Sequence, residues 1–276
     1  MTLPAIIIMV IGIIAAIVGV NKQKQGASWG QALAIVGAII AIGAAVWNFV
    51  GTLNGDQKGI QKNQRAQQLR GLYLGKEIAK ASPKKVVVID NASSHVDGYG
   101  DALTTPVVDH AIEGLKKGLG GATVEVIWQD VPKKQKPANP DEAPIDPGMD
   151  IISLDAKALI AMLPKLEGAD VVVFNALPDG PDSNIDLFKA IGLITGKVKT
   201  AKIAVLGFTD TELLSKGFAA KNSPLIAAVV TRADYDWESD MPSNDDKAFE
   251  QQFVLLTPAD YKAGIEKANK RAEKKK

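Results

Sequence analysis

Three short stretches decide the fold of this chain: VVVID at residues 86–90, VVVF within ADVVVFNALPD at residues 169–179, and KIAVLGF at residues 202–208. Each is rich in β-branched and aliphatic residues, which is typical of a strand buried on both faces of a parallel sheet. Further runs of the same kind predict strands at residues 122–130, 225–231 and 253–256. The sequence therefore predicts a sheet whose strands are mostly parallel.

Helical segments alternate with these strands, at residues 105–119, 154–166, 183–192, 211–220 and 259–270. In the first of them we predict Thr105 as the N-cap and Pro106 as the first helical residue. Gly118, Gly120 and Gly121 are interpreted as the stop of this helix. Because strands and helices alternate with short connections, residues 84–265 are predicted to form one doubly wound α/β domain, with a basic tail at residues 266–276.

Two uncharged apolar runs precede this domain, at residues 3–20 and 29–50. As helices they would measure about 27 and 33 Å, against a bilayer hydrocarbon core of about 30 Å. We therefore predict a two-helix transmembrane hairpin over residues 1–52, in contact with the lipid bilayer. Small residues recur at four-residue spacing, as in Gly12 and Ala16 or Gly37 and Ala41. Such spacing lets helix backbones approach closely, either within the hairpin, in a homo-oligomer or against another membrane protein.

The sidedness of this hairpin is predicted from its flanking charges. The turn between the two runs carries Lys22 and Lys24, while the 20 residues after Val50 carry four bases and one acid. The positive-inside rule then favours a two-pass integral membrane protein with its α/β domain in the cytoplasm, the extracytoplasmic side being the alternative. Residues 53–83 are interpreted as a polar juxtamembrane linker.

Composition excludes several classes of function. The chain has 32 Lys and Arg against 31 Asp and Glu, and this near-balance argues against a nucleic-acid partner. It contains no cysteine and two histidines, so we expect no metal centre. No G-x-x-x-x-G-K-[ST] loop is present, and we expect no cofactor. The acidic row from Asp234 to Asp240 lacks the glycine of an EF-hand and is interpreted as a solvated loop.

Ligands of open α/β sheets bind beyond the carboxyl ends of the strands, where the strand order reverses. The polar residues at those ends are therefore the candidate ligand-binding residues, and they suit a small ligand with hydroxyl or amide groups. They are Asp90, Asn91, Ser93, Ser94, His95 and Asp97 after the first strand, Asn175 and Asp179 after the third, Thr209 and Asp210 after the fourth, and Arg232 after the fifth. The competing interpretation is that such residues cap helices and form turns.

The loop after the first strand also holds the residue types of a nucleophilic enzyme. Asp90, Ser93 or Ser94, and His95 lie within six residues, and catalysis would need them to converge in space. No G-x-S-x-G motif surrounds either serine. A hydrolase or transferase is therefore the alternative, and we expect no catalytic residue and a non-enzymatic role.

The segments VVVIDNASSHVDGYGDAL, VDHAIEGLKKGLGGATVEVIWQD and ADVVVFNALPD together resemble one lobe of the type I periplasmic-binding-protein family. The resemblance covers about residues 84–231 and implies a small-ligand site at residues 91–97 and 175–179. In that family two lobes close on the ligand, whereas this chain is long enough for one. The sequence thus predicts a membrane-anchored ligand-binding or protein-interaction module, or a subunit of a membrane assembly, with a purely structural scaffold subunit as the alternative.

Overall fold

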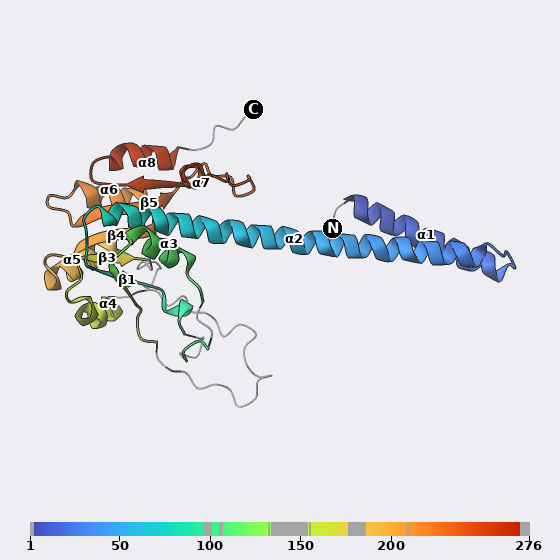
Figure 1. The fold of residues 1–276 in the computed structure, drawn as a ribbon, viewed down its shortest axis with the longest axis horizontal. Helices are drawn as coiled ribbons and strands as arrows, with labels where there is room; N and C mark the ends of the chain where they lie inside the picture. The colour runs from blue at the N-terminus through green and yellow to red at the C-terminus, as the bar shows by residue number, and fades with distance from the viewer. Residues whose placement is uncertain are drawn as a thin grey trace. The chain divides into compact units, whose positions relative to one another are not determined.

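The structure, a computed structural model, describes residues 3–96, 101–104, 107–131, 133, 154, 156–175, 186–208 and 210–270. The chain divides into two compact units, Met1–Asn63 and Gln64–Lys276. Figure 1 labels the α-helices and most strands of both units. The second unit is called the α/β domain below, and each unit is described by itself.

The α/β domain is built on a six-stranded sheet of order β2-β1-β3-β4-β5-β6. Its strands are β1 (Lys85–Ile89), β2 (Thr123–Ile127), β3 (Val171–Phe174), β4 (Lys202–Phe208), β5 (Leu225–Thr231) and β6 (Phe253–Leu256). The first five pair in parallel, and β6 runs antiparallel to β5. The predicted α/β class with a mostly parallel sheet is confirmed.

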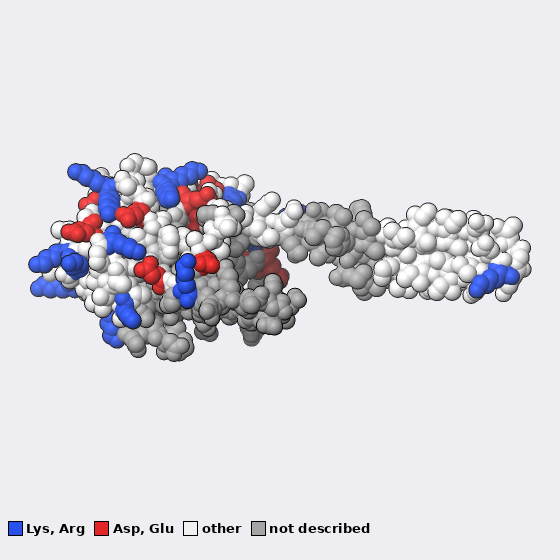
Figure 2. Space-filling model, turned by 90° about the horizontal axis from the view of Figure 1, so that it is seen from below, with Lys and Arg blue, Asp and Glu red and all other residues white. Residues whose placement is uncertain are grey.

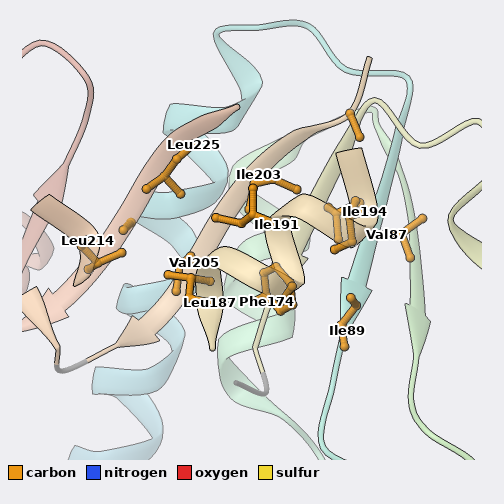
Figure 3. Packing of buried hydrophobic residues seen from close by; sticks show 14 of the residues in the cluster. Val87, Ile89, Phe174, Leu187, Ile191, Ile194, Ile203, Val205, Leu214 and Leu225 are labelled. Atoms are coloured by element: carbon orange, nitrogen blue, oxygen red, sulfur yellow. The ribbon is translucent and has the colours of Figure 1, made fainter. Parts of the chain in front are cut away.

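Helices cover both faces of this sheet, because the strand side chains alternate between two apolar clusters. On one face Val87, Ile89 and Phe174 pack against α4 (Ala156–Met162), η3 (Leu163–Leu166), α5 (Leu187–Lys197), α6 (Thr211–Ala219) and α8 (Tyr261–Asn269). Figure 3 shows Leu187, Ile191 and Ile194 of α5 over these strands. On the other face Val86 and Val88 pack against α3 (His110–Leu119), α7 (Asp245–Gln252) and the C-terminal part of α2 (Gly30–Ala79).

The segment that the sequence presents as a polar linker is helical, and its second half belongs to the core. Ala66, Leu69, Leu74 and Ile78 of α2 are all buried in the cluster beside the sheet. Arg65 and Tyr73 of the same helix bond to Asp245 and Asp246 of α7. The apolar residues looked too sparse for a buried helix because glycines, which leave no hydrophobic mark in the sequence, supply part of the contact.

That glycine contact joins α2 to α3. A Cβ added to Gly71 would overlap the carbonyl oxygen of Ala111, and one added to Gly114 would overlap that of Gln68. Gly75 and Gly118 repeat the arrangement one turn further along. The interpretation of Gly118 as a helix stop is therefore wrong. Gly120, with φ of 68°, is the residue that ends α3.

The first unit contains α1 (Leu3–Lys24) and the N-terminal part of α2, here called the helix pair. The two helices approach at Gly12 and Gly37 and again at Gly19 and Gly30, where an added Cβ would meet the opposite backbone. The side chains that point away from this contact are aliphatic and exposed. Lys22 and Lys24 lie in the last turn of α1, and Figure 2 shows basic side chains at one end of an otherwise white surface of the pair.

The predicted transmembrane hairpin is not supported and is corrected here. Within the part of the chain that the structure describes, no helix combines the length and the apolar character needed to cross a membrane. In α1 the aliphatic run gives way to Asn-Lys-Gln-Lys, and α2 carries charged residues from Asp56 onward. The predicted two-pass integral membrane location therefore does not hold, for either side of the bilayer.

Candidate functional site

The strand order reverses at β1, which lies between β2 on one side and β3 on the other. The chain moves outward from β1 to β2 and then returns past β1 to build β3, β4 and β5. In an open parallel sheet, the carboxyl ends of the strands at such a reversal form the usual place for a ligand. Asp90 directly follows β1 and Asn175 directly follows β3, so both lie at this point.

Asp90 is a buried carboxylate, with 4% of its surface exposed. Its backbone N–H donates to the carbonyl of Ile127 at 2.8 Å, which fixes it between β1 and β2. Its Oδ1 accepts a hydrogen bond from Asn175 Nδ2 at 2.7 Å, and its Oδ2 lies 2.9 Å from Nε2 of His95. A buried carboxylate is stable only when its oxygens are satisfied in this way.

Asn175 joins two carboxylates through one nitrogen. Its Nδ2 donates to Asp90 and also to Oδ2 of Asp109 at 2.9 Å. Because both neighbours are carboxylate oxygens, the amide can be oriented in one way only, with its oxygen directed elsewhere. That oxygen, Oδ1, is buried and has no hydrogen-bond partner among the described residues. Asp90, Asp109 and Asn175 are called the acid–amide cluster below.

Asp109 enters the cluster as the N-cap of α3. Its Oδ1 accepts hydrogen bonds from the backbone N–H groups of Ala111 and Ile112, at 2.8 and 2.9 Å. The helix therefore begins at His110, after the predicted cap Thr105, which lies outside the described residues. Negative charge is favoured at a helix N-terminus, so Asp109 stabilises α3 while its other oxygen holds Asn175.

Arg70 of α2 supplies positive charge near Asp109. Burial lowers the pKa of its guanidinium, and the Asp109 carboxylate acts in the opposite direction. Its Nε is buried without a hydrogen-bond partner among the described residues. An arginine stays protonated under ordinary conditions, so this buried N–H is an unused donor near the cluster.

His95 and Trp128 form a flat aromatic pair beside the cluster. Their ring centroids are 3.8 Å apart and the ring planes differ by 9°. Trp128 follows β2, so the pair extends the site from the ends of β1 and β3 to the end of β2. The next residue, Gln129, is 8% exposed, and its Oε1 is buried without a hydrogen-bond partner among the described residues.

The structure brings together three of the predicted site residues, Asp90, His95 and Asn175. Asn91 and Ser94 lie half-buried in the same loop. Ser93 is in the short helix η1 (Ala92–Ser94), but its side chain is outside the described residues, as are Asp97, Asp179 and Thr209.

The remaining two predicted residues have local partners. Asp210 is the N-cap of α6 and accepts from the N–H of Leu213 at 3.0 Å. Arg232 donates two hydrogen bonds to Asp234, at 2.8 and 2.7 Å, and a third to the carbonyl of Glu250 at 3.0 Å. These contacts fix the ends of β4 and β5.

The acidic row beginning at Asp234 lies in a loop, as expected from the sequence. Asp234 pairs with Arg232, and Asp236 accepts from the N–H of Glu238 at 2.9 Å, which forms a turn. Over the described part of the chain, the structure places no three His, Asp or Glu side chains close enough to hold a metal ion.

Sequence reasoning missed four residues of this site: Arg70, Asp109, Trp128 and Gln129. Asp109 precedes the apolar positions of α3 and could have been recognised as an N-cap, had Thr105-Pro106 not offered a stronger pattern. Arg70 was counted as one of several linker charges. Trp128 and Gln129 directly follow β2, but the strand predicted over residues 122–130 extends past them, so the rule for strand ends did not identify them.

No protein-family model matches this chain, and the curated proteins include none that matches it. The resemblance to a lobe of the type I periplasmic-binding proteins therefore stays a prediction from the sequence pattern.

Proposed function

We propose that the α/β domain binds a small polar ligand at the carboxyl ends of β1, β2 and β3. The observation that carries this proposal is the acid–amide cluster around the buried Asp90 at the strand-order reversal, in which Oδ1 of Asn175 has no hydrogen-bond partner among the described residues. Burying an unpaired carbonyl oxygen costs on the order of 1–3 kcal/mol, so a ligand hydrogen at this point would gain that amount.

The chemistry of the site defines the ligand class. Asn175 Oδ1 and Gln129 Oε1 are acceptors, so the ligand should carry hydroxyl, amide or ammonium hydrogens. Arg70 Nε is a donor, so the ligand should carry at least one oxygen that accepts a hydrogen bond. His95 and Trp128 are stacked, and sugar and base rings pack on aromatic rings of this kind. A polyol, a nucleoside or an amino acid meets these conditions.

A thermal-shift screen of the full chain against sugars, nucleosides, polyols and amino acids tests the proposal. We expect one class to raise the unfolding temperature, and Asp90→Asn to abolish that rise. Asp210→Asn is the matched control, since Asp210 caps α6 and lies outside the cluster. A rise that survives Asp90→Asn, or no rise with any of the four classes, would refute the assignment.

A second candidate, a hydrolase or transferase, is favoured by the contact between Asp90 and His95. A carboxylate that orients an imidazole is the supporting half of a nucleophilic triad. The ring of His95 is stacked on Trp128. We expect a fluorophosphonate probe to leave Ser93 and Ser94 unlabelled, and labelling that disappears in His95→Gln would establish the enzyme instead.

We also propose that the helix pair is a protein-interaction surface. Ile39 and Ile42 are each 64% exposed, and Ile11, Ile14 and Ile17 of α1 are exposed as well. Contiguous apolar surface of this kind marks an interaction site. Ile39→Glu combined with Ile42→Glu should abolish self-association or partner co-purification of the full chain. Sedimentation velocity measures this, and Lys58→Glu, on the polar part of α2, is the control.

A further inference from the structure

The α/β domain has a groove at the edge of its sheet, away from the acid–amide cluster. Within the described residues β6 is the edge strand and pairs only with β5. A cavity of about 500 Å³ runs beside it, between residues of α7 on one side and α8 on the other. This cavity, with β6 as its floor, is called the edge groove.

Apolar side chains form the inner part of the edge groove. Phe249 stacks on Tyr73 with ring centroids 4.1 Å apart, and Phe253 lies 5.7 Å from Phe249. On the α8 side Ala263 and Gly264 make the wall low, and Lys267 lines the groove beside them. A groove of this volume has room for a few side chains of a bound segment, with small residues leaving space for its backbone.

The backbone of β6 also presents hydrogen-bonding groups to the edge groove. Val254 lies opposite Val230. Two residues earlier, the backbone N–H of Arg232 donates to the carbonyl of Gln252 at 2.9 Å, so these two residues bond across the two strands. Residues of an antiparallel strand alternate between bonding to the neighbouring strand and facing away from it. The N–H and C=O of Leu255 therefore face away from β5, and Leu255 lines the groove.

The charges around the edge groove are mostly negative. Its lining includes the carboxylates of Asp246, Glu250 and Asp260 and one base, Lys267. Asp246 accepts from the hydroxyl of Tyr73, and Asp260 accepts from Thr257, which holds both in place. Glu250 is exposed on α7. An incoming basic group would meet these three acids at the rim.

We propose that the edge groove binds an extended segment of a partner protein, with Lys or Arg at alternate positions, as an added strand on β6. Strand addition takes its affinity from backbone hydrogen bonds and its selectivity from alternate side chains. A second copy of this chain is disfavoured as the occupant, since two such edges would bring like charges together. The short β6 limits the added strand to a few residues.

Fluorescence anisotropy of the full chain with a labelled seven-residue peptide of alternating lysine and valine tests this proposal. We expect saturable binding of this peptide. We expect none for the same peptide with glutamate in place of lysine. We also expect none for a version with N-methylated backbone amides, because it cannot pair with β6.

Two substitutions at one exposed position of α8 sharpen the test. Ala263→Lys should weaken binding of the lysine peptide and Ala263→Glu should strengthen it, each by about two- to fivefold, as exposed charge pairs do. Circular dichroism confirms that both variants fold. Equal binding of the N-methylated peptide, or no response to the charge at position 263, would overturn the proposal. Self-association of the chain that follows the charge at position 263 would overturn it in favour of a second copy.

Discussion

Two pairs of helices in this chain pack through glycine, and they end in different surroundings. In the helix pair, Gly12 and Gly19 of α1 lie against Gly37 and Gly30 of α2. In the α/β domain, Gly71 and Gly75 of α2 lie against Gly114 and Gly118 of α3. The backbones touch in the same way, but the outer side chains of the first pair are exposed whereas those of the second are buried on the sheet.

Glycine spacing thus predicts the contact between two helices and nothing about their outer faces. The outer faces depend on what the rest of the chain provides. Beside α2 and α3 the sheet offers Val86, Val88 and Val173, all fully buried. Among the described residues of its own unit, the helix pair has no sheet beside it, and its aliphatic side chains are exposed.

The largest expected effect on stability comes from truncating a large side chain, at a buried position of the α/β domain and at an exposed position of the helix pair. Leu74→Ala should lower the free energy of unfolding of the α/β domain by about 2–5 kcal/mol, because Leu74 is fully buried. Ile39→Ala, at a position 64% exposed, should leave it unchanged. Urea unfolding of the full chain, followed by circular dichroism, measures both. Equal losses in the two variants would contradict the assignment of Leu74 to the core and of Ile39 to an exposed face.

A methyl group added at the glycine contact should have the next largest effect. Gly114→Ala places a Cβ on the carbonyl of Gln68 and should cost about 1–3 kcal/mol through forced separation of α2 and α3. Gly192→Ala in α5 is the control, because an added Cβ there meets nothing within 4 Å. That control should stabilise the domain by about 1 kcal/mol through helix propensity alone. Chemical denaturation of the two variants should therefore give shifts of opposite sign.

A smaller effect is expected where α2 meets α7 at the surface. Arg65 donates to Asp245 at 2.8 Å and to the carbonyl of Ser243 at 2.7 Å, in a partly exposed position. Arg65→Ala should therefore cost no more than about 1 kcal/mol, as exposed ion pairs do. The loss should shrink in 1 M salt, where such pairs are screened. A salt-independent loss would mean that the aliphatic part of Arg65 contributes through packing.

The smallest expected effect is a pH dependence at Tyr73. Burial raises the pKa of Tyr73, and its hydrogen bond to Asp246 and the nearby carboxylates act in the same direction. The folded domain thus favours the neutral phenol. Above pH 10, where tyrosine ionises in the unfolded chain, stability should fall as pH rises. Denaturation midpoints between pH 8 and pH 11 should fall less steeply in Tyr73→Phe than in the unaltered chain.

The strands were predictable because strands buried on both faces of a parallel sheet have continuous aliphatic sequences. KIAVLGF and LIAAVVT coincide with β4 and β5, and the short run at residues 253–256 coincides with β6. Helix α7 was missed because DDKAFEQQ contributes only Ala248 and Phe249 to the core in its first turns, which is too little for an apolar stripe. The helix pair was predicted as two helices, but its apolar character led to the wrong conclusion about the membrane.

The candidate site was predictable as far as it depends on strand ends. Asp90 and Asn175 follow strands that are neighbours in the sheet, so the rule for α/β ligand sites identifies them. Asp109 reaches the candidate site from the N-terminus of α3, and Arg70 reaches it from α2. Their positions depend on how α2 and α3 pack, which rests on glycines whose effect appears only in three dimensions.

Because Nδ2 of Asn175 donates to both Asp90 and Asp109, substitutions at these three positions depend on one another in related sequences. An aspartate in place of Asn175 would set three anions side by side, and a leucine there would remove the amide donor to one oxygen of each acid. Positions 90, 109 and 175 should therefore change in concert. In a homologue with a neutral residue at position 90 or 109, we expect position 175 to vary freely.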